Sequence, residues 1–399
     1  WVGDRLPVGF FDEMIDGEGG ILLPGLVNCH THTAMTAMRG YGDGHDLQDW
    51  LHNYIFPVEA KWDDRAIRAC TALGLAEMIA SGTTCIADMY MHIDAVAQEV
   101  AAAGINANLC CGGVLFDPVF DPKTHHDCVE QEEMTRRWHG YNGGQILFDA
   151  SLHAEYTSRP ELWKWTADFA KANGLGMHVH VSETRKEHEA CIAKYGKTPL
   201  QILDQYGVWD VRAIAAHCVW TTPDDWALMA EKGISPVHNP VSNLKLGSGS
   251  APVPAMRKAG VNVALGTDGV SSNNSLDMVE ELKFAAVLHN GASHDPLALL
   301  SGDALAMATA NGAKALGRKS GRIAADYDAD LILLDSRRLN LIPCHDPISN
   351  VAYAAHGSDV RMNMARGKVI YKDGDFLTID IARVKREVAE YAVPLLFGA

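Results

Sequence analysis

Short runs of apolar, β-branched residues alternate with longer amphipathic stretches along most of the chain. This alternation is typical of repeated strand–helix units and predicts a parallel sheet covered by helices. Glycines follow several of the amphipathic stretches, where helices commonly end. Eight apolar runs have the length of a strand, namely 25–28, 84–88, 107–111, 146–150, 176–181, 213–217, 234–237 and 263–266. Eight such strands predict an α/β fold of the closed (β/α)8 TIM-barrel type.

The pattern changes on both sides of this unit. Residues 322–335 and 360–377 have the pattern of strands joined by tight turns, and Asp373-Gly374 is a typical hairpin corner. Residues 14–23 have a similar pattern of strand, turn and strand. We therefore expect a small β-domain made from both chain ends beside the barrel, with segments 1–23, 24–315 and 316–399.

Composition limits the class of partner. The chain has 399 residues, of which 47% are hydrophobic, and its 34 Lys+Arg against 50 Asp+Glu give a net charge of −16. The hydrophobic content is that of a folded globular protein. The negative charge argues against a nucleic acid or an anionic membrane surface as partner. No apolar run approaches the roughly 18 residues of a membrane span. A small molecule is the expected partner.

The cysteines and the N-terminus bear on location. The nine cysteines include no C-x-x-C pair, which suits reduced thiols better than a disulfide framework. The first residues lack a signal-peptide profile. We therefore expect a cytoplasmic protein, although the chain begins without Met and a processed start could hide a targeting segment.

Histidines are the polar residues most suggestive of chemistry, with 18 in the chain. His30 and His32 directly follow the first predicted strand. On an extended backbone, residues two apart point to the same face, so both rings can bind one cation. An H-x-H pair alone is a weak signal, because many such pairs are surface or core histidines.

Further candidate ligands stand at the ends of other predicted strands. His180 ends the fifth, His217 ends the sixth, and Asp268 follows the eighth. The carboxyl ends of barrel strands meet at one rim, where barrel active sites lie. Taken singly, each histidine is as well explained by a structural role. Together, they predict a site of nitrogen and carboxylate ligands that suits Zn²⁺ or Fe²⁺.

Three other residues near these strand ends require separate interpretations. Glu183 follows His180 by three residues, and burial there would raise its pKa and let it carry a proton. The alternative for Glu183 is an ordinary acidic residue in the first turn of a helix. His178 is expected to point to the other side of its strand and to be structural, and His238 to have a structural or supporting role.

Several sequence motifs surround the candidate site residues. They are Pro24-Gly-Leu-Val-Asn28-x-His30-Thr-His32, His180-Val-Ser-Glu183, Ala215-Ala-His217-Cys218, His238-Asn-Pro and Gly266-Thr-Asp268-Gly. Together these motifs resemble the amidohydrolase superfamily, and within it the methylthioadenosine/S-adenosylhomocysteine deaminases. The resemblance covers nearly the whole chain. It implies a metal-bearing barrel flanked by a β-sandwich from both chain ends, whose first strands this chain is expected to lack, and often a homo-oligomer.

The resemblance also implies a role for individual residues. His30, His32, His180 and Asp268 would hold one metal, with zinc expected and iron as the alternative. Asp268 would also act as the base, Glu183 would contact the purine and protonate N1, and His217 would face the attacking water. Glu59 and His153 match positions that contact the ribose hydroxyls. No lysine stands at the end of the fourth strand to bridge a second metal.

The expected reaction is hydrolytic deamination of an adenosine-type nucleoside to its inosine analogue and ammonia. Relatives that accept S-adenosylhomocysteine are expected to hold its carboxylate with arginines after the third strand. Here no arginine follows that strand before Arg136, which favours methylthioadenosine, 5′-deoxyadenosine or adenosine. Lys123 could still pair with an anion, so S-adenosylhomocysteine stays an alternative substrate. The alternatives are a deaminase or chlorohydrolase of guanine, cytosine or a triazine, and a non-catalytic, metal-free binding protein.

Overall fold

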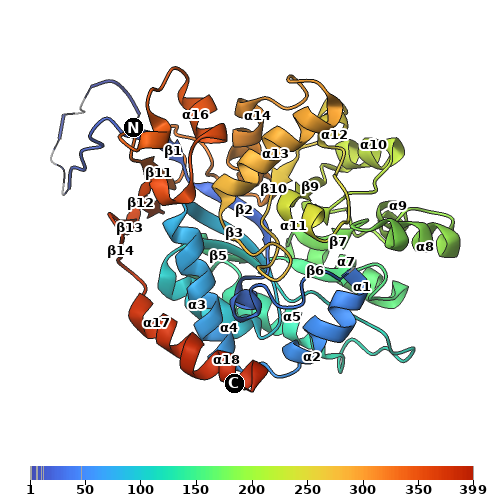
Figure 1. Ribbon diagram of the computed structural model, residues 1–399. Coiled ribbons are helices and arrows are strands. Elements are labelled where there is room, and N and C mark those ends of the chain that lie inside the picture. The colour runs from blue at the N-terminus through green and yellow to red at the C-terminus, as the bar shows by residue number, and fades with distance from the viewer. Residues whose placement is uncertain (1, 6–7, 10, 12, 46, 399) are drawn as a thin grey trace.

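Two parallel sheets form the centre of the protein, and helices pack around them (Figure 1). The computed structural model describes residues 2–5, 8–9, 11, 13–45 and 47–398. The strands of the first sheet are, in order, β2 (Leu26–Thr31), β3 (Thr83–Met89), β4 (Asn106–Cys110) and β5 (Ile146–Phe148). Those of the second are β6 (Ala150–Ala154), β7 (Met177–Val181), β8 (Ala213–His217), β9 (Ser235–His238) and β10 (Ala264–Leu265).

The two sheets meet on both sides, as a barrel requires. On one side, β5 and β6 are consecutive in the chain and are separated only by Asp149. On the other side, the backbone N–H of Asp268, just beyond β10, donates to the carbonyl oxygen of His30 in β2 at 2.9 Å. The parallel sheets and their covering helices form an α/β fold of the TIM-barrel type. The expected run 146–150 spans the junction of β5 and β6.

The helices begin and end where the sequence provides capping residues. α10 begins at a capping box of Thr222 and Asp225 and ends at Gly233, whose φ is 70°. The longer helices around the barrel are α3 (Asp64–Ala80), α4 (Ile93–Ala103), α5 (His126–Trp138), α7 (Pro160–Asn173), α8 (Arg185–Tyr195), α10 (Pro223–Lys232) and α13 (Met278–Ser293). The shorter ones are α1 (Leu47–Trp50), α2 (Phe56–Glu59), α6 (Tyr141–Gly144), α9 (Pro199–Asp204), α11 (Pro240–Lys245), α12 (Val253–Lys258), α14 (Ser301–Met307), α15 (Ala310–Ala315) and α16 (Pro347–Tyr353).

A separate antiparallel sheet joins the two ends of the chain. Its strands are, in order, β1 (Ile21–Pro24), β11 (Leu331–Leu334), β12 (Val360–Ala365), β13 (Lys368–Lys372) and β14 (Asp375–Phe376). Asp373 and Gly374 form the expected hairpin corner, with φ values of 50° and 97°. A second layer that would complete a sandwich is not present among the described residues, so the sandwich stays a prediction.

The two ends of the chain differ in part from the expected strands. Of the expected segment 1–23, residues 1, 6–7, 10 and 12 lie outside the described part, and 13–17 have no regular structure. Beyond the sheet, the chain forms α17 (Ile381–Glu387), which packs against α3, and α18 (Val393–Phe397) (Figure 1). Along the described chain, every helix is too short or too polar to cross a membrane.

Candidate metal centre and active site

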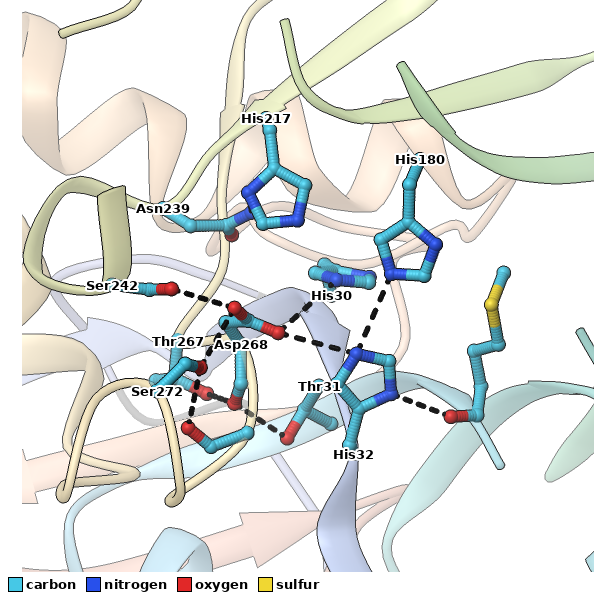
Figure 2. Close-up of polar contacts among 12 residues, drawn as sticks. His30, Thr31, His32, His180, His217, Asn239, Ser242, Thr267, Asp268 and Ser272 are labelled. Atoms are coloured by element: carbon cyan, nitrogen blue, oxygen red, sulfur yellow. Dashed lines mark hydrogen bonds and ion pairs between the residues drawn. The ribbon is translucent and has the colours of Figure 1, made fainter. Parts of the chain in front are cut away.

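Three imidazoles and one carboxylate converge at the carboxyl end of the barrel (Figure 2). Oδ1 of Asp268 lies 3.4 Å from Nε2 of His30 and 3.2 Å from Nε2 of His32. Nε2 of His180 lies 3.4 Å from Nε2 of His32. The same cluster includes His217. One possible ligand atom from each of His217, His30 and Asp268 lies within 4.8 Å of the other two. The structure thus brings together five residues that the sequence placed at strand ends.

Backbone carbonyls hold two of these rings with Nε2 facing the cluster. The Nδ1 atom of His32 lies 2.6 Å from the carbonyl oxygen of Met89. The Nδ1 atom of His180 lies 2.6 Å from the carbonyl oxygen of His153. A carbonyl can only accept a hydrogen bond, so each ring carries its proton on Nδ1 and keeps a lone pair on Nε2. A lone pair on Nε2 is what metal coordination requires.

The ring of His30 is held differently, and this corrects the expectation for His178. Nδ1 of His30 lies 2.9 Å from Nε2 of His178. The prediction that His178 points to the other side of its strand is wrong, because residues two apart on a strand share a face. His178 and His180 both point into the barrel.

The donor set fits a divalent metal. His30 is fully buried, and its Nε2 atom has no partner in hydrogen-bonding geometry among the described residues. An unpaired buried nitrogen is costly unless a ligand satisfies it. Three imidazole nitrogens and one carboxylate oxygen are a donor set that zinc and ferrous iron accept. Zinc or iron is therefore consistent with the residues present.

Two serine hydroxyls hold the carboxylate of Asp268 in place. Its Oδ2 accepts hydrogen bonds from Oγ of Ser242 at 2.6 Å and from Oγ of Ser272 at 2.8 Å. Burial alone would raise the pKa of Asp268, but the imidazoles of His30 and His32 outweigh burial and hold that pKa well below its usual range. Its carboxylate is therefore charged when it faces the cluster.

Close backbone packing explains part of the Gly-Thr-Asp-Gly motif around Asp268. A Cβ atom at Gly266 would lie 2.8 Å from the backbone of His30 and 2.6 Å from Oδ1 of Asn239. Only glycine fits where β10 closes against β2. Asp268 and His217 themselves have positive φ values of 62° and 70°, a backbone conformation that is strained for such residues and concentrates at functional sites.

Glu183 lies beside this cluster and is buried. Its Oε2 lies 3.7 Å from Nε2 of His217, and Nδ1 of His217 lies 2.9 Å from Oδ1 of Asn243. Burial raises the pKa of Glu183, and His217 opposes that rise. The carboxyl group of Glu187 accepts backbone N–H groups of Ser182 and Glu183 at 2.8 and 3.1 Å. Glu183 is therefore held in place, and its raised pKa favours a proton carrier.

A cavity of about 490 Å³ opens directly above the cluster. Glu59 and His153, expected to contact a ribose, both line it. Oε1 of Glu59 accepts a hydrogen bond from the hydroxyl of Tyr90 at 2.8 Å. Nδ1 of His153 lies 3.0 Å from Oγ1 of Thr157, and burial lowers the pKa of His153 to about 4. His153 is thus neutral. The Thr157 hydroxyl donates to the carbonyl oxygen of Ala154 at 3.2 Å, so Nδ1 of His153 donates to that hydroxyl and Nε2 is an acceptor.

Apolar and acidic side chains make up much of the remaining cavity wall. Trp50, Ile55 and Phe56 are among the apolar lining residues. Asp127 and Glu130 of α5 are among the acidic ones. Among the described residues that line the cavity, none is Lys or Arg. An adenine ring suits the apolar residues, whereas an anionic substituent has no Lys or Arg to pair with.

Sequence reasoning missed several residues that support the site. Ser242, Ser272 and Tyr90 each bond a predicted site residue. Ser242 and Ser272 stand within a few residues of His238 and Asp268, so the loops after the seventh and eighth strands were the available signal. Tyr90 directly follows β3, and its aromatic character alone does not distinguish it from a core residue.

The TIM-type barrel and the histidine–carboxylate cluster define a class, that of barrel proteins with a candidate metal centre at the carboxyl rim. Residues 21–370 match the model of the amidohydrolase family, and the chain belongs to this family. It is 43% identical over 388 residues to the 5-methylthioadenosine/S-adenosylhomocysteine deaminase of Acetivibrio thermocellus, covering 96% of this chain and 89% of that protein.

Two further relatives extend the comparison. The chain is 41% identical over 385 residues to the 5′-deoxyadenosine deaminase of Methanosarcina mazei, covering 96% of this chain and 89% of that protein. Its structure is similar to that of an adenosine deaminase from Xanthomonas campestris with bound zinc, with a TM-score of 0.88 and 34% identity over 94% of this chain and 85% of that one. The family expected from the motifs is confirmed.

Proposed function

We propose that this chain is a metal-dependent hydrolase that deaminates an adenosine-type nucleoside to its inosine analogue and ammonia. The observation that carries the proposal is a cluster of ligand atoms beneath a nucleoside-sized cavity. Oδ1 of Asp268 faces Nε2 of His30 and of His32, and Nε2 of His180 faces Nε2 of His32. These four residues would hold one divalent metal, which we propose to be zinc. The relatives described as deaminases of methylthioadenosine, S-adenosylhomocysteine and 5′-deoxyadenosine support this class of substrate.

The site residues divide the chemistry between them. A bound divalent metal supplies a water whose pKa falls to about 7, so that hydroxide is available near neutral pH. Asp268 is placed to take the proton of the attacking water. Glu183 protonates N1 of the adenine while oxygen attacks C6, and His217 faces the same oxygen. Asp268 would then pass the proton that it took to the amino group, and the C6–N bond breaks to release ammonia. The remaining hydroxyl proton would return to Glu183 as the carbonyl of the hypoxanthine ring forms.

Two residues on the cavity wall would position the ribose. Glu59 accepts the Tyr90 hydroxyl on one oxygen, and its other oxygen remains able to accept from a ribose hydroxyl. His153 has Nε2 as an acceptor, since its Nδ1 is paired with Thr157. Two acceptors on one wall suit a vicinal diol, whose hydroxyls are both donors. Placing the ribose there would direct the adenine toward Glu183.

The Glu183→Gln variant tests the proposed reaction. The amide keeps the shape of the side chain but cannot donate and recover a proton, so turnover should fall by roughly 10²- to 10⁴-fold. Zinc content should stay that of the unmodified protein, because Glu183 is not one of the proposed ligands. Deamination is followed by the ultraviolet absorbance change from adenine to hypoxanthine. Glu189→Gln, at an exposed carboxylate on α8 paired with Arg185, is the matched control and should leave the rate unchanged. A Glu183→Gln enzyme of near-normal rate would remove Glu183 from this role.

Within this class, we propose that nucleosides without a carboxylate on the 5′ substituent are preferred. Two features of the cavity support this preference. None of the described lining residues is Lys or Arg, and the lining includes the acidic residues Asp127 and Glu130. Methylthioadenosine should have a higher kcat/KM than S-adenosylhomocysteine. Glu130→Gln should narrow the difference, whereas Glu132→Gln, at an exposed position on the same helix, should not. A preference for S-adenosylhomocysteine would contradict the proposal. The cytoplasmic location and homo-oligomeric state expected from the sequence stay predictions.

A further inference from the structure

His178 lies directly behind the candidate metal centre, on the strand that also carries His180. It occupies the second position of β7 and is 1% exposed. Its Nε2 lies 2.9 Å from Nδ1 of His30, and its Nδ1 lies 3.5 Å from Sγ of Cys110, a side chain that is also buried. These contacts form a continuous line of polar atoms from His30 to Cys110.

Two other imidazoles of the cluster are held by backbone oxygen atoms. The acceptors are the carbonyl oxygen of Met89 for His32 and the carbonyl oxygen of His153 for His180. Nδ1 of His217 lies 2.9 Å from Oδ1 of Asn243 and 3.3 Å from Nδ2 of Asn239. Backbone carbonyl oxygens only accept, so they hold the proton on the facing ring nitrogen. A ring nitrogen accepts in one tautomer and donates in the other. The tautomer of His30 therefore depends on that of His178.

The direction of the hydrogen bonds follows from the role of His30. If Nε2 of His30 binds a cation, its proton must lie on Nδ1. That N–H donates to Nε2 of His178, which therefore carries no proton. The proton of His178 then lies on Nδ1 and points to the sulfur of Cys110, a weak acceptor. The opposite tautomer of His178 would set two N–H groups against each other in a buried position.

We propose that His178 is a positioning residue that holds His30 in the tautomer with Nε2 free for a cation, and thereby sets the metal affinity of the centre. This inference rests on the metal site proposed above. Partners of this kind orient the ligand ring and raise its basicity, and their loss costs roughly 10- to 100-fold in metal affinity. His32 and His180 are held by backbone oxygens, whereas His30 is held by a side chain that can be replaced by mutation.

Two substitutions at His178 separate its hydrogen bond from its packing. His178→Leu fills space but offers no acceptor, and His178→Gln offers Oε1 to the same N–H group. In competition with a chromogenic chelator, apoprotein carrying His178→Leu should bind zinc roughly 10- to 100-fold more weakly than the unmodified chain. His178→Gln should recover most of this loss.

A second buried histidine provides the control. His289 is 3% exposed, and its Nε2 lies 3.2 Å from Nε2 of His238 rather than from a proposed ligand. His289→Leu removes a buried imidazole pair of the same kind and should leave zinc affinity unchanged. Equal losses in His178→Leu and His178→Gln, or an unchanged affinity in His178→Leu, would overturn the inference while leaving the metal site intact. An unmodified chain that binds no zinc would overturn the proposed function as well.

Ring ¹⁵N NMR tests the same inference without a destabilising substitution. In the zinc-loaded, unmodified protein with ¹⁵N-labelled histidine, His178 should show a protonated Nδ1 and an unprotonated Nε2. The His178→Gln spectrum assigns its signals by their disappearance. Protonation of His178 at Nε2 would mean that this atom donates to His30, and the inference would then be wrong.

Discussion

Two buried polar clusters lie at opposite ends of the barrel, and they differ in how far the chain itself satisfies them. At the amino end, Oδ1 of Asp149 accepts hydrogen bonds from Arg212 and from the backbone N–H of Gly176 at 3.1 Å. Its Oδ2 accepts from Nδ2 of Asn108 at 2.8 Å, and Oδ1 of Asn108 accepts from Nε of Arg318 at 2.9 Å. Each carboxylate oxygen and each charge there has a partner in the chain.

At the carboxyl end, the polar groups are close together but incomplete. Among the described residues, Nε2 of His30 makes no hydrogen bond, and the ion pairs of Asp268 are with two imidazoles and with no Lys or Arg. Burial of an unsatisfied polar group costs about 1–3 kcal/mol. The satisfied network around Asp149 is suited to stability, and the incomplete cluster around Asp268 is suited to ligand binding. The predictions below test this division.

Removal of the metal should have the largest effect, and it should be confined to the carboxyl end. Without a bound cation, the attacking water keeps its ordinary pKa, so the loss of about 4 kcal/mol or more of transition-state stabilisation should lower turnover by ~10³-fold. The amino-end network does not include the proposed ligands, so the apoprotein should still unfold cooperatively. Turnover is assayed after chelation, and thermal unfolding is followed by circular dichroism.

Readdition of metal is the control for this experiment. Stoichiometric zinc should restore turnover in the chelated protein. Undiminished turnover at zero metal content would contradict the proposed mechanism. Unfolding of the chain on chelation at room temperature would show instead that the carboxyl end is needed for the fold, and the division between the two ends would be wrong.

Replacement of Arg212 should lower stability and leave turnover unchanged, which is the opposite of the effects of metal removal. Arg212→Met leaves the carboxylate of Asp149 buried, with a side chain only 3% exposed, and without its cation. Removing one partner of a buried ion pair costs roughly 3–5 kcal/mol. Because Arg212 is partly exposed, the decrease in the free energy of unfolding should be near the lower of these values. Urea denaturation measures this loss. Zinc content and the turnover of the folded enzyme should not change.

A surface arginine of similar exposure provides the comparison. Arg257 pairs with Asp303, and their side chains are 29% and 33% exposed. Arg257→Met should cost at most about 1 kcal/mol, because water solvates the carboxylate that remains. A loss in Arg212→Met no larger than that in Arg257→Met would mean that the amino-end network does not stabilise the barrel.

The same comparison explains what the sequence could predict. Strand ends are visible as the limits of apolar runs, so the rim positions of His30, His32, His180, His217 and Asp268 followed from topology alone. Strand periodicity places the side chain of His178 on the same face as that of His180. The expectation that His178 points to the other side was wrong because it did not apply this period of two. Partners far apart in the chain leave no local pattern, so the Asp149–Arg212 pair could not be found. Ser242 and Ser272 lie in segments that follow predicted strands, but nothing in the sequence shows that their hydroxyls reach Asp268.

The assignment of Glu59 came from resemblance, and the structure adds a partner that makes it testable. The hydroxyl of Tyr90 accepts from Nε1 of Trp62 at 3.1 Å and donates to Glu59 at 2.8 Å. Burial raises the pKa of Tyr90 well above its usual range, and the neighbouring Glu59 carboxylate reinforces the rise. The hydroxyl therefore stays protonated and remains a donor to Glu59 at any pH of assay.

Replacement of Tyr90 should give the smallest effect, limited to substrate binding. Tyr90→Phe removes a hydrogen bond worth about 1 kcal/mol, so KM for adenosine should rise by roughly 5-fold with little change in kcat. Because the proposed contact of Glu59 is with a ribose hydroxyl, 2′,3′-dideoxyadenosine should show no such rise. Tyr327→Phe, at a more exposed tyrosine, should behave as the unmodified chain. Equal losses with both nucleosides would mean that Tyr90 supports the cavity wall and that Glu59 does not hold the ribose.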